Sequence, residues 1–194
     1  MPILVLLNGG PASGKSTLAR LWAARRPLAL ALDIDVVRAL IPGWEDDPVQ
    51  AGRAARDLAV AMARSQLEAG RDVIVPQFLA RAEFVDRLSE LARDHRVPFV
   101  HIVLRERADV AEARFAARAS AAYERGRDCG HGALQGPLGA PSMAEPLAAH
   151  DRFIAERPEA TVMHGIDGDI PASLEHLTAA ITRASMGPSL KQGG

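Results

Sequence analysis

Residues 9–17 combine glycines, a lysine and hydroxyl side chains at a spacing suited to holding phosphate groups. The run Gly-Gly-Pro-Ala-Ser-Gly-Lys-Ser-Thr fits the pattern G-x-x-x-x-G-K-[ST] at Gly9, Gly14, Lys15 and Ser16. A loop that wraps backbone N–H groups around anionic oxygens needs positions without a Cβ and a helix N-terminus directed at the charge. The two glycines and the helix expected after Gly14 meet these needs, which predicts a site for a nucleoside triphosphate.

The pattern also assigns roles within the loop. Lys15 would place its charge on the β and γ phosphates, the Ser16 hydroxyl would take one coordination position on Mg²⁺, and Thr17 would meet the α phosphate. The remaining residues of the predicted nucleotide-binding set are Gly10, Pro11, Ala12 and Ser13. The alternative is a glycine-rich turn before an ordinary helix, which the apolar run before the loop and the helical pattern after it disfavour.

Two carboxylates, Asp33 and Asp35, follow a second apolar segment. At i and i+2 at the end of a strand they would point to one side of a sheet, at the carboxyl edge where ligands bind in open α/β folds. We expect Asp33 near the metal and Asp35 hydrogen-bonded to the hydroxyl that attacks the γ phosphate. An alternative and compatible role for Asp35 is the N-cap of a helix over residues 36–41.

Arginines form the third group of candidates. Arg114 and Arg118 stand at i and i+4 of a predicted helix, so they share a face and could both turn toward the phosphates when a neighbouring loop closes. Phosphoryl transfer needs such charge, since its transition state spreads negative charge over equatorial oxygens. For each arginine, a solvated helix face with acidic partners is the alternative. Further candidates in this group are Arg105, Arg107, Arg125 and Arg127.

Apolar segments that resemble strands alternate with segments of helical pattern, which predicts an α/β fold with a parallel sheet covered on both faces. We predict strands near 3–8, 28–33, 71–76, 98–104 and 160–164, and helices over 15–25, 35–41, 48–69, 81–95, 106–122, 142–157 and 171–184. Residues 126–141 are rich in glycine and predict a mobile loop, and residues 187–194 predict a frayed tail. We expect one domain over residues 1–186.

Composition narrows the class of nucleotide protein. A chain of 194 residues fits one domain, and a net charge of −1 with 4% aromatic residues offers little to attract or stack nucleic acid. The single Cys129 excludes a disulfide framework and a cysteine-based metal site. We find no signal-peptide layout and no apolar stretch near the ~20 residues that span a bilayer, and so expect a cytoplasmic protein.

The chain resembles the P-loop small-molecule kinases in three places: Leu7–Thr17, Asp35–Leu40 and Ala111–Arg118. Among these the chloramphenicol phosphotransferases are most similar, with shikimate kinases, gluconate kinases and zeta toxins more distant. The resemblance covers about the first 120 residues and implies a nucleoside-monophosphate-kinase-like three-layer fold, strand order 2-3-1-4-5, ATP and Mg²⁺ as cofactors, a lid near residues 114–141 and a hydroxyl acceptor. The resemblance places Asp35 where these enzymes have their proposed catalytic base. It places Arg114 and Arg118 where the family has lid arginines.

One departure from this family concerns the third predicted strand, which ends in Pro76-Gln77 where many P-loop kinases carry an aspartate near the metal. Either Asp33 or Asp35 takes over that duty, or metal binding is weakened. Gln77 then becomes a candidate for hydrogen-bonding the acceptor, with strand-end turn chemistry as its alternative.

In the fold that this resemblance implies, the segment between the second and third predicted strands carries the substrate-binding helices, so we expect that segment to contact the acceptor. Trp44 could form an apolar wall there or lie in the core, and Arg53 or Arg56 could meet an anionic group or remain solvated. The acidic run 45–47 argues against a polyanionic acceptor. We assign no role to His131 and His150, because isolated histidines near loops are mostly exposed.

Three functions remain open at this point. The leading hypothesis is an ATP-dependent phosphotransferase acting on an alcohol group of an antibiotic, a sugar or another metabolite, as a monomer or homodimer, with GTP as a possible donor in place of ATP. The second is a polynucleotide or nucleoside 5′-hydroxyl kinase, which the balanced charge disfavours. The third is a nucleotide-dependent switch ATPase with no acceptor.

Overall fold

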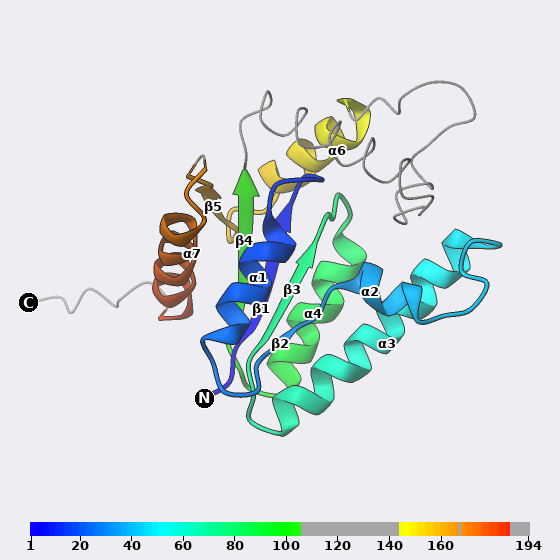
Figure 1. Cartoon of the computed structure of the whole chain (residues 1–194), viewed down its shortest axis with the longest axis horizontal. Helices are drawn as coiled ribbons and strands as arrows, with labels where there is room; N and C mark the ends of the chain where they lie inside the picture. Colours follow the sequence, from blue (N-terminus) through cyan, green and yellow to red (C-terminus); the bar gives the residue numbers. More distant parts are fainter. Residues whose placement is uncertain (106–143, 167, 187–194) are drawn as a thin grey trace, which may run out of the picture.

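A computed structural model describes residues 1–105, 144–166 and 168–186, and within them a five-stranded parallel sheet forms the centre of the molecule (Figure 1). The strands are β1 (Leu4–Gly9), β2 (Leu30–Ala31), β3 (Val73–Gln77), β4 (Phe99–Arg105) and β5 (Thr161–His164). Their order is β2-β3-β1-β4-β5, as predicted, and every neighbouring pair is parallel. The phosphate-binding loop leaves the carboxyl end of β1, the central strand.

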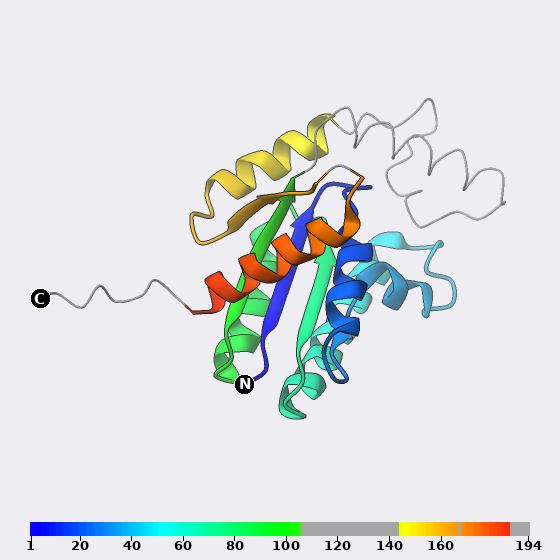
Figure 2. The same ribbon diagram turned by 60° about the vertical axis from the view of Figure 1, so that its left-hand side comes forward.

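Helices cover both faces of the sheet (Figures 1 and 2). The described helices are α1 (Lys15–Ala24), α2 (Ile34–Ala39), α3 (Pro48–Glu68), α4 (Ala82–Asp94), α6 (Ala144–Ala155) and α7 (Ile170–Ser185). One apolar cluster joins α1 and α7 to the sheet, and a second joins α2, α3, α4 and α6 to its other face. The arrangement is the three-layer fold that the alternating pattern predicts.

Successive side chains of β1 point alternately to the two faces of the sheet, and so pack against different helices. Leu4 and Leu6 belong to the cluster under α3 and α4, whereas Val5 and Leu7 belong to the cluster under α1 and α7. All four are fully buried, as expected for a central strand of a parallel sheet. The same alternation turns Asn8, the next residue, toward the face covered by α3, α4 and α6.

Two local predictions near β2 are wrong. The second strand has only Leu30–Ala31 instead of residues 28–33, since Leu28 has a positive φ of 56° and the chain leaves the ladder before Asp33. The helix that follows begins at Ile34, and its N-cap is Asp33, whose Oδ1 accepts a hydrogen bond from the Asp35 N–H at 3.1 Å. The strand alternation that was expected to place both aspartates on one side therefore does not apply.

Several predicted features lie outside the described residues. They are the helix over 106–122, the lid region 114–141, the tail 187–194 and the candidate arginines Arg107, Arg114, Arg118, Arg125 and Arg127. The single-domain extent of residues 1–186 stays a prediction for the same reason. In the described parts of the chain, no helix has the length and apolar character needed to cross a membrane.

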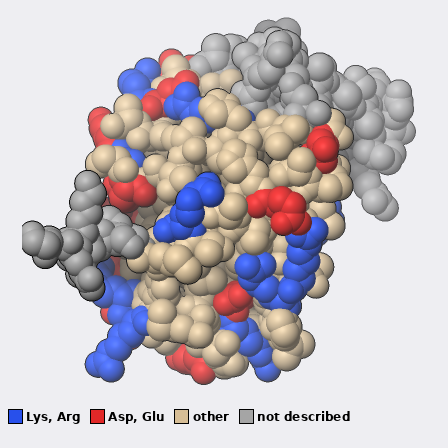
Figure 3. Space-filling model, turned by 90° about the vertical axis from the view of Figure 1, so that its left-hand side faces the viewer, with Lys and Arg blue, Asp and Glu red and all other residues tan. Residues whose placement is uncertain are grey.

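Charged side chains of both signs are interspersed on the face that Figure 3 shows. Ion pairs also join surface elements, as Arg25, the C-cap of α1, pairs with Glu175 of α7. A broad basic tract, the usual footprint of nucleic-acid binding, does not form among the described residues of this face.

Candidate functional site

The two glycines of the phosphate-binding pattern are required for different physical reasons. A Cβ on Gly9 would lie 2.7 Å from the main-chain oxygen of Leu104, so β4 approaches too closely for any other residue. Gly14 has open space around its Cβ position but a φ of +84°, a left-handed conformation that favours glycine. Gly14 is also the N-cap of α1, and no side chain caps this helix. The first N–H groups of α1 are thus left for an anionic ligand.

Lys15 and Ser13 complete the geometry of the loop. The Lys15 ammonium donates a hydrogen bond to the Gly10 carbonyl at 3.0 Å, which turns its charge back over the loop. The Ser13 hydroxyl is buried and has no hydrogen-bond partner among the described residues. Backbone donors, a lysine and an orphaned hydroxyl in one loop form the kind of cradle that a phosphate group fits.

The Ser16 hydroxyl donates a hydrogen bond to Oδ2 of Asp33 at 2.9 Å. Asp33 thus has two duties, since its other carboxylate oxygen caps α2. Of the two aspartates that could replace the missing third-strand carboxylate, it is Asp33 that the fold brings to the P-loop serine. This juxtaposition depends on β2 ending early, because the chain turns into α2 beside the N-terminus of α1.

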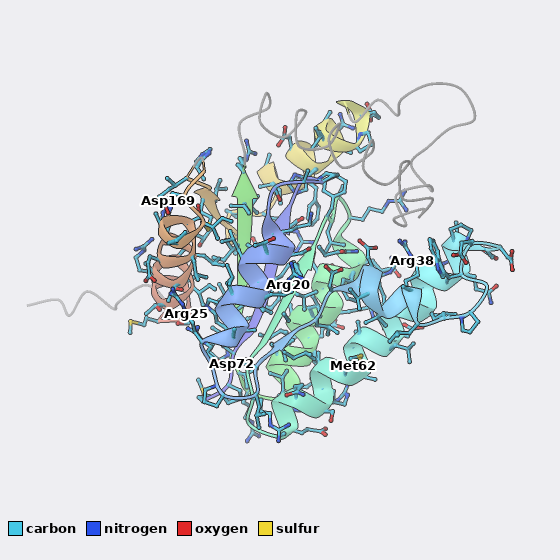
Figure 4. The ribbon with its side chains drawn as sticks, in the orientation of Figure 1. Arg20, Arg25, Arg38, Met62, Asp72 and Asp169 are labelled. Carbon is cyan, nitrogen blue, oxygen red and sulfur yellow. The ribbon has the colours of Figure 1, made fainter. Side chains whose placement is uncertain are left out.

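Asp35 lies in the first turn of α2 and its carboxylate is half exposed, at 51%. Arg38, three residues later, forms an ion pair with Asp35 at 3.2 Å and also lies over the Trp44 ring, 4.7 Å from its centroid. Trp44 is partly exposed rather than in the core, and one ring face is occupied by Arg38. Figure 4 shows Arg38 beside α2, at the side of the molecule where α2 and α3 meet. Arg38 was not among the predicted residues, although its i+3 spacing from Asp35 is a recognisable signal.

The other predicted residues lie farther apart in the fold. Gln77 ends β3 and is the register partner of Asn8, so it lies at the carboxyl edge beside the start of the P-loop. Arg53 is exposed on α3, and Arg56 on the same helix is partly buried. Arg105 ends β4 and forms an ion pair with Asp151 of α6 at 3.1 Å.

Three buried polar side chains at this edge were not predicted. Asn8 is fully buried and bonds to both main-chain groups of Leu79, just after β3. His101 of β4 lies 3.4 Å from the Asn8 amide. His150 of α6, to which no role was assigned, is 4% exposed, and its ring centroid is 5.2 Å from that of Phe78. A polar residue within an otherwise apolar strand is the signal that could have revealed Asn8 and His101.

Helix α6 packs directly on the phosphate-binding loop. A Cβ on Gly10 would lie 3.3 Å from Cδ2 of Leu147 in the first half of this helix. His150 follows Leu147 by three residues, so the two lie on one face of α6. The Nε2 atom of His150 is buried without a hydrogen-bond partner among the described residues. In this way α6 adds a wall to the site that no motif predicted.

Burial keeps both histidines neutral near pH 7. It lowers the pKa of His101 to about 4, with smaller and partly opposing effects from Glu159, Arg157 and His150. Burial is also the main reason that the pKa of His150 lies below its usual value; Asp151 opposes this, while Arg105 and Lys15 add to the lowering. Neutral histidines can accept hydrogen bonds through one ring nitrogen.

The oxygen donors at Ser16 and Asp33 fit a magnesium ion better than a softer metal. Among the described residues, no three or more histidine, cysteine, aspartate or glutamate side chains come together as a metal site. Mg²⁺ usually keeps several waters and is bound by one or two carboxylates together with substrate phosphates. The Ser16 hydroxyl and the Asp33 carboxylate, beside a loop suited to phosphate, agree with this mode of Mg²⁺ binding.

Residues 4–129 match the family model described as AAA domain (AAA_33). Calmodulin calcium-dependent NAD kinase from Arabidopsis thaliana is 30% identical to the chain over 111 residues, which are 48% of this chain and 21% of that protein. The chain therefore spans about a fifth of the length of this curated relative.

Solved structures share the fold over nearly the whole chain. APS kinase from Mycobacterium tuberculosis, in complex with AMPPNP and APS, superposes with a TM-score of 0.60 at 18% identity and covers 93% of this chain and 98% of its own. A gluconokinase from Sinorhizobium meliloti 1021 superposes with a TM-score of 0.57 at 14% identity, covering 95% of this chain and 94% of its own. The predicted P-loop kinase fold, with its nucleotide-binding loop, is confirmed.

Proposed function

The chain belongs to the AAA domain family, and from this premise we propose that it is a kinase that transfers the γ-phosphoryl group of ATP, with Mg²⁺, to a hydroxyl group of a small molecule. The acceptor class comprises antibiotics, sugars and other metabolites. The kinase names of the proteins of similar fold support the reaction class, and the AMPPNP complex of APS kinase supports a nucleotide as the phosphate donor.

The observation that carries the proposal is the hydrogen bond from Ser16 to Asp33 at 2.9 Å. It joins the phosphate-binding loop to the start of α2, where Asp35 follows after one residue. A P-loop by itself is shared by motors, switches and kinases. A carboxylate at the loop serine together with a second, half-exposed carboxylate supports transfer to an acceptor.

In this proposal the loop N–H groups at the start of α1 and the Lys15 ammonium bind the β and γ phosphates. Ser16 and Asp33 would hold Mg²⁺, which supplies positive charge to neutralise the phosphate oxygens. Asp35 accepts the proton of the acceptor hydroxyl as its oxygen bonds to the γ phosphorus and the bond to the ADP oxygen breaks. The ion pair with Arg38 orients the Asp35 carboxylate during this step.

The acceptor would lie between Asp35, Gln77 and the segment that carries Trp44. Gln77 is at the right edge of the sheet to hydrogen-bond a polar group. Because Arg38 already covers one face of Trp44, the indole would offer its edge or its other face. Arg53 is a candidate for an anionic substituent. Arg114 and Arg118 remain proposed to stabilise charge on the transferred group.

The test is a screen for ATP consumption over hydroxylated antibiotics, sugars and nucleosides, with mass detection of a product heavier by one phosphoryl group. A phosphorylated small molecule whose formation needs Lys15 and Asp35 is the expected result. A product on an oligonucleotide 5′ end would support a polynucleotide kinase instead. ATP hydrolysis that no acceptor accelerates would support a switch ATPase and overturn the proposal.

A further inference from the structure

Asn8 links the strand that carries the phosphate-binding loop to the segment after β3. Asn8 is fully buried, and it directly precedes Gly9, the first glycine of the loop. The Leu79 N–H donates to Asn8 Oδ1 at 3.0 Å, and Asn8 Nδ2 donates to the Leu79 carbonyl at 3.1 Å. One side chain thereby satisfies both main-chain groups of a residue 71 positions away.

The orientation of the Asn8 amide follows from its partners. A backbone N–H can only donate, so Oδ1 faces Leu79 N, and Nδ2 faces the Leu79 carbonyl and His101 Nε2, 3.4 Å away. His101 is neutral near pH 7, so its Nε2 lone pair can accept this bond. Turning the amide over would set like groups against each other at both Leu79 contacts, whereas His101 Nε2 can match either orientation through its choice of tautomer.

The segment 77–79, which Asn8 holds through Leu79, contacts two parts of the candidate site. Gln77 and Phe78 directly precede Leu79, and Gln77 is paired in register with Asn8 itself. Phe78 packs against His150 of α6, the helix whose Leu147 covers Gly10. A shift of Leu79 would therefore move Gln77 and Phe78 relative to the phosphate cradle.

We propose that Asn8 is a positioning residue of the kinase site, which holds Gln77 and Phe78 in register with the phosphate-binding loop through the main chain of Leu79. The inference rests on the proposed function for its kinetic consequence. It assigns Asn8 no contact with substrate. Its effect is to keep the acceptor side of the site at a fixed distance from the bound phosphates.

A matched control exists at the other end of the same strand pair. Asp72, just before β3, accepts a hydrogen bond from the Ile3 N–H at 3.1 Å and pairs with Arg26 at 3.3 Å. It thus ties β1 to β3 as Asn8 does, but at the amino edge of the sheet. Figure 4 shows Asp72 at the end of the molecule opposite the phosphate-binding loop. Asp72→Ala removes a comparable side-chain link without touching the site.

The first measurement is amide hydrogen exchange with and without AMPPNP. In Asn8→Ala we expect segment 77–81 to lose protection by at least about 10-fold, while the interior of β1 and β3 keeps its protection. AMPPNP should add protection to this segment in the wild-type protein and in Asp72→Ala, and much less in Asn8→Ala. Unchanged exchange of segment 77–81 in Asn8→Ala would overturn the inference.

The second measurement is the kinetics of transfer to the acceptor found in the screen. Asn8→Ala should lower kcat on the order of 10- to 100-fold and raise the KM for the acceptor, with the KM for ATP little changed, because misplaced contacts cost rate even when binding of the donor survives. Asp72→Ala should keep kcat near the wild-type value at a temperature where both variants are folded. Equal loss of kcat in the two variants, or a loss confined to the KM for ATP, would show a structural role only.

A second variant covers the case in which Asn8→Ala does not fold. Asn8→Asp keeps an oxygen for the Leu79 N–H but, when ionised, has no donor for the Leu79 carbonyl or His101. Burial raises the pKa of such a carboxyl, and its protonated form regains one donor. His101, its titratable neighbour, has a pKa of about 4 beside the neutral Asn8, but a carboxylate at position 8 would raise that pKa, so protonation of either group restores a donor between them as the pH falls. The loss of kcat in Asn8→Asp relative to the wild type should therefore become smaller as the pH falls from 8 toward 6. A loss that stays constant over this range would count against a positioning role of the Asn8–Leu79 hydrogen bonds.

Failure of the kinase proposal would be separable from failure of this inference. If the wild-type protein phosphorylates no acceptor, the proposed function fails, and hydrogen exchange then decides the inference alone. AMPPNP-dependent protection of segment 77–81 that Asn8→Ala abolishes and Asp72→Ala retains would still support positioning of the nucleotide site. No effect of AMPPNP on this segment in the wild-type protein would overturn it.

Discussion

Asp33 Oδ2 accepts a hydrogen bond from the Ser16 hydroxyl at 2.9 Å, while Asp33 Oδ1 accepts one from the Asp35 N–H and so caps α2. One carboxylate thus fixes the angle at which α2 leaves the sheet and marks where a metal would meet the phosphate-binding loop. The two duties use different oxygens, so two substitutions can separate them.

Asp33→Asn should impair metal use and spare the fold. Asparagine caps helices as well as aspartate does, but it removes the charge beside Ser16. We expect the Mg²⁺ concentration for half-maximal activity to rise about 10-fold or more, the usual scale for a lost group around a metal site. Asp33→Ala should in addition lower the free energy of unfolding by about 1 kcal/mol through loss of the cap. Magnesium titration of activity and urea unfolding check the two effects, and equal metal dependence of wild type and Asp33→Asn would contradict this assignment.

Asp35→Asn and Lys15→Ala should fail at different steps. Asp35→Asn is expected to keep AMPPNP affinity and to lose transfer by about two orders of magnitude, since a positioned base contributes roughly that much. Lys15→Ala should lose both affinity and turnover. Calorimetric titration with AMPPNP and product formation by mass spectrometry give the two quantities. Arg20→Ala on the exposed side of α1 is the control, and normal transfer by Asp35→Asn would refute the role of Asp35.

Gly9→Ala should be destabilising because its Cβ would lie 2.7 Å from the Leu104 main-chain oxygen, which belongs to a central strand and cannot move aside. Strain of this kind costs typically 1–3 kcal/mol, so we expect a loss of about 2 kcal/mol in the free energy of unfolding and weaker AMPPNP binding. Gly52→Ala is the opposite control: its Cβ would meet only the Arg56 guanidinium at 3.7 Å, inside α3. It should stabilise by about 0.5–1 kcal/mol. Thermal unfolding that shifts in the same direction for both variants would contradict the close-approach argument.

His101 should make the protein less stable in mild acid. Its pKa is about 4 when folded and 6.5 in its ordinary state, so between these values the unfolded chain binds the additional proton. The free energy of unfolding therefore falls as the pH falls from about 6.5 to 4, by roughly 3 kcal/mol for this group, and levels off below. His101→Gln keeps a hydrogen-bond acceptor but cannot titrate, so its stability should change less across this range. Denaturant unfolding at pH 7 and 5 measures the difference, and an equal loss of stability in the wild-type protein and in His101→Gln would contradict it.

The phosphate-binding loop was predictable because its signal is local, and the layered parallel sheet because strand and helix patterns alternate along the chain, whereas the strand order followed only from the resemblance to the P-loop small-molecule kinases. Gly14, Lys15 and Ser16 are consecutive, so their geometry follows from one turn of backbone and the start of one helix. The boundaries of α3 and α7 agree with the prediction within one or two residues, since Asp47 and Asp169 cap them and Pro48 and Pro171 occupy their first turns. The length of β2 was not predictable in this way, because β3 continues beyond its last residue paired with β2, and β2 ends where the chain turns into α2 after its cap Asp33.

The sequence by itself predicted a phosphate-binding loop after the first strand, since that pattern resides in nine consecutive residues. Only the tertiary structure decided that Asp33 and not Asp35 meets Ser16, that Asn8 clamps Leu79, and that His150 lies against Phe78. The reason is sequence separation: the first two pairs lie 17 and 71 positions apart, and the third joins α6 to the segment just after β3. Contacts of this kind depend on the register and packing of whole elements, which the pattern of any one segment does not specify.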